Sequence, residues 1–255
     1  RPRTRARAVT DPGPEEGGDP QLWSVTLDRP FLVVRFPQLH EVASWAVVGG
    51  GRRQTRTVAW LEVRNADLAP GVDAITLADR RLQERGLGEA VGLLTSRRID
   101  RHHEHHAICG DVKARALATV GLSNALRVGD SPGPLRVGLH PDAPGYGTIN
   151  VLAAVSEPLS EEAAWEAMSI AAEARTAAVM EAGFPSRRSG AIATGTGTDC
   201  LVVAWPSRAP ESRAAPAAFA GKHTALGHVI GETVFHAVRA GVAAWLAENQ
   251  PGGTP

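Results

Sequence analysis

Residues 161–182 read EEAAWEAMSIAAEARTAAVMEA and predict one long helix. Ser160 stands directly before them as a good N-cap, and Glu161 and Glu162 carry the negative charge that suits a helix N-terminus. The high alanine content favours helix and permits close packing against a neighbour. Gly183 follows the last turn, where glycine commonly ends a helix.

A second long helix is predicted further along the chain, at residues 225–247. Its apolar residues recur at helical spacing: Leu226, Val229, Ile230, Val234, Val238 and Val242. A shorter helix is predicted at residues 73–85, where Asp73 is suited to cap the first turn and Gly86 closes the last.

The rest of the chain reads mainly as short strands separated by turn residues. The predicted strands are residues 31–36, 42–48, 57–63, 90–95, 114–120, 135–139, 148–155 and 201–205. Strands that cluster early and long helices that come late favour the α+β class over a regular βαβ alternation. We therefore expect mainly antiparallel sheets packed with two long helices from the C-terminal half, in a single layered domain.

The size and charge of the chain restrict the classes of protein to which it can belong. It has 255 residues, 43% of them hydrophobic, which is enough for one large domain with a real core. We assign that domain to residues 21–248 and expect disordered tails at residues 1–20, rich in Arg, Pro and Gly, and at 249–255. Lys and Arg together number 27, as do Asp and Glu, so the basic surplus of a nucleic-acid binder is absent.

Targeting signals and cysteine content point to the cytoplasm. No stretch approaches the roughly 18 consecutive apolar residues of a membrane-spanning helix, and residues 1–20 lack the apolar core of a secretory signal. The two cysteines, Cys109 and Cys200, do not make a disulfide framework. We expect a soluble cytoplasmic protein with reduced thiols and no membrane partner.

The densest polar motif is residues 194–200, TGTGTDC, which lies between two apolar, strand-like runs. Alternate glycines allow a sharp turn and let a ligand approach the backbone N–H groups. The spacing fits neither a phosphate-binding loop nor a dinucleotide fingerprint, in which a third glycine would replace Cys200. The motif offers backbone donors for an oxyanion and hydroxyl or carboxylate groups for proton handling. The alternative is a tight turn whose threonines bond locally.

A second polar motif, Gly221-Lys222-His223-Thr224, precedes the predicted helix at 225–247. Free N–H groups at a helix start favour anions, histidine can transfer protons near neutral pH, and lysine can hold a developing negative charge. This favours an acid/base or anion-binding corner. The alternative is an ordinary cap, with Thr224 as N-cap and the cations at the surface.

Residues 102–106, HHEHH, with Cys109 nearby, suggest a metal site by composition alone. They contain neither the H-E-x-x-H spacing nor a pair of C-x-x-C motifs, so we expect a hairpin loop and no metal site built for catalysis.

Asn124 and Asn150 each stand beside a predicted strand end, where an amide is suited to bind a ligand with many carboxamides. The alternative for each is a turn residue that satisfies its own backbone.

Taken in order, these motifs resemble the adenosylcobinamide amidohydrolase family of cobamide salvage, over residues 31–245. The chain departs from the family pattern at Arg175, where lysine is expected, and at residues 102–106, a local embellishment. The motifs that carry the resemblance are Ala43-Ser44 with Gly49-Gly50-Gly51, VGLLT (91–95), GLSNA (121–125), GTIN (147–150), EARTAA (173–178), ATGTGTD (193–199) and AGKHTALG (220–227). The last two, at 193–199 and 220–227, are the most specific.

The resemblance implies hydrolysis of the amide that joins aminopropanol to the corrin ring of adenosylcobinamide. The products would be adenosylcobyric acid and 1-amino-2-propanol, from which a cell can rebuild a cobamide with its preferred lower ligand. The cobalt arrives with the corrinoid substrate, so no cofactor and no metal of the protein's own is expected.

Amide hydrolysis needs an activated nucleophile, a stabilised oxyanion and a protonated leaving amine. Within the resemblance, Asp199 or His223 would handle protons, and Thr198 would attack or orient water. Lys222 and the N–H groups near Gly195 and Gly197 would stabilise the oxyanion. The expected substrate-binding residues are Ser44, Asn124, Asn150, Thr194, Gly195, Thr196, Gly197 and Thr224.

Several alternatives stay open at this point. Cys200 is a rival nucleophile, although its apolar downstream neighbours suggest a buried, inert thiol. A corrinoid carrier or sensor without catalysis would keep the asparagines but would not need Asp199 and His223 together. A hydrolase of another bulky amide fits the same motifs. The alanine-rich helix at 161–182 suits a homo-oligomer and a buried intrachain helix equally well.

Overall fold

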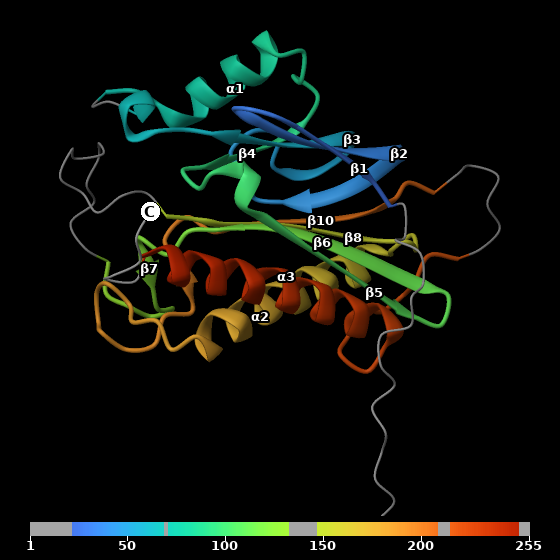
Figure 1. The fold of residues 1–255 in the computed structure, drawn as a ribbon. Coiled ribbons are helices and arrows are strands. Elements are labelled where there is room, and N and C mark those ends of the chain that lie inside the picture. The colour runs from blue at the N-terminus through green and yellow to red at the C-terminus, as the bar shows by residue number, and fades with distance from the viewer. Residues whose placement is uncertain (1–21, 69–70, 133–146, 209–214, 250–255) are drawn as a thin grey trace, which may run out of the picture.

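The computed structural model describes residues 22–68, 71–132, 147–208 and 215–249 (Figure 1). Several predicted segments lie wholly or partly outside these residues. They are the tail at 1–20, the tail at 249–255 apart from its first residue, and the strand at 135–139.

Eight strands form one sheet that folds over on itself, so that its two halves lie one above the other (Figure 1). The order is β4-β3-β2-β10-β8-β6-β5, with β1 paired to β2 off this path. Neighbouring strands are antiparallel except β3 with β4 and β8 with β10. The bounds are β1 Ser24–Asp28, β2 Phe31–Ser44, β3 Gly51–Glu62, β4 Val91–Thr95, β5 His102–Cys109, β6 Val112–Val120, β8 Ile149–Val155 and β10 Cys200–Pro206.

β2 is the strand that joins the two halves. Its first part pairs with β1 and β3, and its second part pairs with β3 and β10. The pairing register shifts between Arg35 and His40. The sequence predicted two separate strands here, at 31–36 and 42–48, whereas the structure has one long strand that ends at Ser44.

The predicted helices are confirmed. They are α1 (Ala74–Glu84), α2 (Glu161–Glu181) and α3 (Ala225–Asn249), and 3-10 turns lie at Asn65–Leu68 and Ile99–Arg101. The Asp73 and Ser160 side chains accept hydrogen bonds from backbone N–H groups in the first turns of α1 and α2. None of the helices in the described part of the chain combines the length and the apolar character needed to cross a bilayer.

The layers follow from the alternation of side chains along each strand. In β8, Leu152 and Ala154 face the core between the two halves of the sheet, whereas Val151 and Ala153 face α2 and α3. A third buried cluster lies between α1 and the strands β3 and β4. The order of layers is therefore α1, half-sheet, half-sheet, then α2 beside α3 (Figure 1). This confirms the α+β class with a mainly antiparallel sheet.

The alanines of α2 are used inside the chain. Those that are buried pack in the core that α2 shares with α3 and the sheet: Ala163, Ala164, Ala167, Ala171, Ala174 and Ala178. Small side chains let α2 approach its neighbours closely, which accounts for the composition of this helix without a second copy. Homo-oligomerisation stays a prediction.

The predicted hairpin loop at residues 102–106 is wrong, because these residues begin strand β5. β5 is an edge strand of the sheet, and its alternate side chains have different environments. Glu104, on one face, accepts hydrogen bonds from Trp23 (3.3 Å) and Arg115 (2.8 Å). His103, on the other face, approaches α3 at Gly241. Polar side chains on a strand edge concealed the strand from pattern analysis.

Candidate active site

The Asp199 carboxylate lies at the entrance to β10, enclosed by donors. It accepts hydrogen bonds from the backbone N–H groups of Thr196 (2.9 Å) and Ile149 (3.1 Å), and from the Thr196 hydroxyl. It also forms an ion pair with Arg175 of α2. The Asp199 side chain is only 8% exposed and the Arg175 side chain 15% exposed.

These surroundings act on the carboxyl in opposite directions. Burial is the largest effect and raises the pKa of Asp199 above its ordinary value, although the Arg175 guanidinium and the donors from Thr196 and Ile149 oppose the rise. All four groups that contact the carboxylate donate, so each of them suits its ionised form. The carboxylate is therefore occupied in holding the chain around it and is not turned toward open solvent.

Residues 194–199 include the short strand β9 (Gly195–Thr196), which pairs with β7 (Ala125–Leu126), and they are tied to the large sheet and to residues 147–148 before β8. Trp45 donates its indole N–H to the carbonyl of Asp199 (2.7 Å). The Thr148 hydroxyl donates to the carbonyl of Thr198 (2.8 Å), and the Thr198 hydroxyl donates to the carbonyl of Gly147 (3.2 Å). These bonds hold Thr198 at the surface with its backbone fixed.

Gly195 leaves the room that the ion pair needs. A Cβ at this position would clash with Oδ2 of Asp199 and would lie 3.1 Å from Nη1 of Arg175. A Cβ at Gly197 would lie 3.1 Å from the end of the Leu126 side chain and in ordinary contact, at 3.8 Å, with Nδ2 of Asn124. Of the two glycines in the motif, Gly195 is thus the one at which a side chain would displace the Asp199–Arg175 ion pair.

Thr198 also lines a cavity of about 210 Å³ between β4 and the starts of β8 and β10. Its walls are mostly apolar, with polar contributions from Thr95, Thr148, Asn150 and Cys200. Asn150 is fully buried and uses both ends of its amide within the protein. It donates to the carbonyl of Leu94 (2.7 Å) and accepts from the Thr148 hydroxyl (3.2 Å), so it ties β8 to β4.

Three other residues predicted to bind substrate accept hydrogen bonds from backbone N–H groups of the chain itself, two of them from residues far away in the sequence. Asn124 accepts from the N–H of Gly197 (3.3 Å), Thr194 accepts from Val128 (2.8 Å), and Ser44 accepts from Ala46 (3.2 Å). Ser44 also lines a small cavity of about 100 Å³ beside three tryptophans: Trp45, Trp165 and Trp205.

The second motif stands at the start of α3. Thr224 is its N-cap, because its hydroxyl accepts from the N–H of Gly227 (3.0 Å) and donates to the carbonyl of Gly221 (2.8 Å). Lys222 and His223 are exposed, and Lys222 forms an ion pair with Glu173 of α2. Lys222 and Glu173 line a groove of about 540 Å³ between α2 and α3.

α2 separates the two motifs. Glu173, which pairs with Lys222, and Arg175, which pairs with Asp199, are two residues apart on this helix. Two residues correspond to about 200° around a helix axis, so the two side chains leave α2 on opposite sides. Among the described residues, no hydrogen bond or ion pair joins Lys222 or His223 to residues 194–199.

Sequence reasoning missed how much Arg175, Trp45 and Thr148 contribute to this site. The sequence marks Arg175 as a departure from the family pattern, and the default interpretation of a charge on a helix is a solvated or locally paired side chain. Its position on the buried side of an alanine-rich helix was the available signal. Thr148 belongs to the motif GTIN (147–150), but nothing near it or near Trp45 in the sequence indicates their hydrogen-bond partners, which are far away along the chain.

Cys200 begins β10 directly after Asp199 and is buried. Burial raises the pKa of its thiol to about 12, and the neighbouring Asp199 adds to the shift. At neutral pH the thiolate is therefore scarce, which disfavours Cys200 as a nucleophile.

The family model described as adenosylcobinamide amidohydrolase matches residues 21–250. A protein of Halobacterium salinarum named adenosylcobinamide amidohydrolase is 34% identical over 155 residues, which are 60% of this chain and 58% of the relative. The match thus spans little more than half of that relative's length.

Two solved structures resemble the chain at 13% sequence identity. They are a beta-aminopeptidase of Burkholderia sp., with a TM-score of 0.42, and a protein of Pyrococcus horikoshii OT3, with a TM-score of 0.44. Each alignment covers 84% of this chain and 78% of the other. At these scores the likeness does not bear on the activity.

Proposed function

The chain belongs to the adenosylcobinamide amidohydrolase family, and from that premise we propose that it hydrolyses the aminopropanol amide of adenosylcobinamide. The products would be adenosylcobyric acid and 1-amino-2-propanol, and the reaction would serve corrinoid salvage. The observation that carries the proposal is the extent of the family match, because residues 21–250 include both the 194–199 motif and the 220–227 motif.

We place the reacting amide beside Thr198. This residue combines an exposed side chain with a backbone fixed by Thr148, and it borders the cavity between β4, β8 and β10. A fixed hydroxyl at a cavity wall suits either a nucleophile or a group that orients water. The apolar walls would exclude bulk water around the amide.

Asp199 acts in this proposal as a positioning residue. Its four donors leave it poorly placed to take a proton from water, and they hold the loop that carries Thr198. Proton handling then falls to His223, which is exposed, and oxyanion stabilisation to Lys222. α2 separates this corner from Thr198, so these two roles require residues 221–224 to move toward the amide when the corrinoid binds, and the His223→Gln variant tests whether this corner takes part.

The direct test is to incubate purified, untagged protein with adenosylcobinamide in the presence of EDTA and to follow adenosylcobyric acid by mass spectrometry. Catalytic turnover supports both the amidohydrolase proposal and the expectation that the reaction needs no resident metal. Binding without product, seen as a shifted corrinoid absorbance, would instead indicate a carrier or sensor. The absence of both product and binding would overturn the corrinoid assignment and would favour another bulky amide as the substrate.

The proposal also includes a cytoplasmic reaction, on the grounds that both cysteines, Cys109 and Cys200, are unpaired. A corrinoid small molecule is the only partner that the reaction requires.

A further inference from the structure

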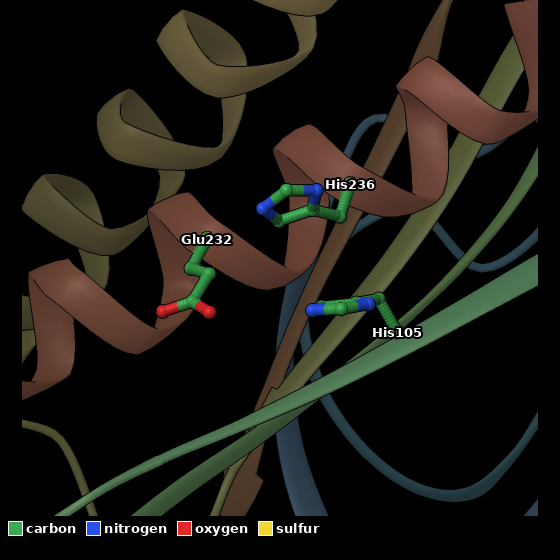
Figure 2. Close-up of side chains that lie close together, drawn as sticks. All are labelled: His105, Glu232 and His236. Atoms are coloured by element: carbon green, nitrogen blue, oxygen red, sulfur yellow. The ribbon is translucent and has the colours of Figure 1, made fainter. Parts of the chain in front are cut away.

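Two imidazoles and a carboxylate converge where the edge strand β5 passes over the middle of α3. His105 comes from β5, and Glu232 and His236 come from α3 (Figure 2). One potential ligand atom from each lies within 4.8 Å of the others. We propose that these three residues bind a divalent transition metal, with Zn²⁺ as the representative ion, and that the metal ties β5 to α3.

The secondary structure brings these groups together. Glu232 and His236 are four residues apart on α3, so they lie on one face of the helix. Strand alternation turns His105 toward α3, and its ring centroid is 4.7 Å from that of His236. Two imidazole nitrogens and one carboxylate are a usual ligand set for zinc, and they leave a fourth position for water.

The neighbouring contacts prepare the carboxylate. His228 lies one turn before Glu232, and its Nε2 is 3.1 Å from the Glu232 carboxylate. Such an outer partner orients a metal-binding carboxylate. His105 makes no hydrogen bond to any other described residue, so its nitrogens are not committed elsewhere. All three proposed ligands are only partly buried, which leaves the site open to ions from solvent.

Binding requires two local adjustments. Ligand atoms on one tetrahedral zinc lie about 3.4 Å apart, given Zn–N bonds of about 2.0–2.1 Å, so the side chains must close in slightly. Arg239 donates a hydrogen bond to Nδ1 of His236 (3.1 Å), which places the proton of the neutral ring on Nε2. A metal at Nε2 would therefore release Arg239 as the proton moves to Nδ1.

This site is separate from residues 194–199 and does not depend on the proposed reaction. It also differs from the site that the sequence suggested. Of residues 102–106, only His105 belongs to the proposed ligand set, and the other ligands come from more than a hundred residues later in the chain.

The test uses untagged full-length protein freed of metal by a chelator and titrated calorimetrically with ZnSO₄. We expect one equivalent to bind and to raise the melting temperature. His105→Ala, Glu232→Gln and His236→Ala should each weaken binding at least ~10-fold. The matched control is His106→Ala, the adjacent exposed histidine in the same strand, which should bind as the wild type does.

Two further measurements keep the result decisive. Co²⁺ in place of Zn²⁺ should give the visible absorption of a tetrahedral site, and Glu232→Gln, which preserves side-chain shape, should abolish it. Arg239→Gln should bind at least as tightly as wild type, because it removes a competing donor and a repelling charge. The proposal would be overturned if no stoichiometric site were found, or if His106→Ala and Arg239→Gln lost as much zinc affinity as the three ligand variants. Either result would leave adventitious binding by surface histidines.

Discussion

Residues 194–199 and residues 221–224 carry comparable polar chemistry, but the fold holds them in opposite ways. In the first group, Asp199 is enclosed by four donors, one of which is the partly buried guanidinium of Arg175. In the second group, Lys222 and His223 face solvent, and the main attachment is the cap made by Thr224. The first arrangement provides rigidity and the second provides access. A hydrolase needs both, because positioned groups must meet a mobile substrate.

The largest expected effect tests the rigidity of the enclosed group. Arg175→Gln should lower the free energy of unfolding by about 3–5 kcal/mol, because it leaves the Asp199 carboxylate buried without its counter-ion. The measurement is urea denaturation followed by circular dichroism. Arg175→Lys is the matched control, since it keeps the charge, and it should lose clearly less. Equal losses in the two variants would show that the charge pairing is not what stabilises this loop.

The next effect tests the access provided by the second group. His223→Gln should reduce turnover of adenosylcobinamide about 100-fold, if His223 handles the proton, while the unfolding free energy stays unchanged. The control is His106→Gln, which removes an exposed imidazole on another element. Full turnover by the His223 variant would remove this corner from the chemistry and return the proton-handling role to residues 194–199.

A smaller effect separates the two glycines of the enclosed motif. Gly195→Ala should destabilise the protein by about 1–3 kcal/mol, because its Cβ overlaps the Asp199–Arg175 pair. Gly197→Ala should be close to neutral, since the Leu126 side chain can move aside. Thermal unfolding of both variants gives the comparison, and similar melting temperatures would argue against steric selection at Gly195.

The surface ion pair provides the contrast to Arg175. Lys222 is 71% exposed and Glu173 50% exposed, so Lys222→Ala should change the unfolding free energy by less than about 1 kcal/mol. Any difference measured at low salt should shrink at high salt, because salt screens an ion pair between exposed side chains. A loss as large as that of Arg175→Gln would mean that the two groups are held equally firmly.

The smallest effect on activity is expected at Cys200. Cys200→Ala should retain turnover, because burial raises the pKa of the thiol to about 12 and keeps it protonated. The same shift predicts slow alkylation of Cys200 at pH 8 relative to the less buried Cys109. The stabilisation due to the raised pKa is present below the unfolded value of about 8.5 and is lost as pH rises toward 12. Loss of turnover in the alanine variant would restore the thiol as a nucleophile.

Local patterns were sufficient for the helices. The cap at Ser160, the alanines after it and the apolar repeat in 225–247 act over one or two helical turns, so each can be recognised without the rest of the fold. β5 was missed because histidines and a glutamate on an edge strand do not alternate in polarity. The long β2 was divided because its second half finds a partner, β10, about 160 residues later.

The site shows the same limit more sharply. By itself the sequence determined the helices, the α+β class and the two polar motifs with their family resemblance, since composition and spacing are local properties. Only the tertiary structure decided that Asp199 meets Arg175, that α2 stands between the two motifs, and that His105 faces Glu232 and His236. These contacts join segments whose separation along the chain carries no periodic signal, so packing of the layers is what brings them together.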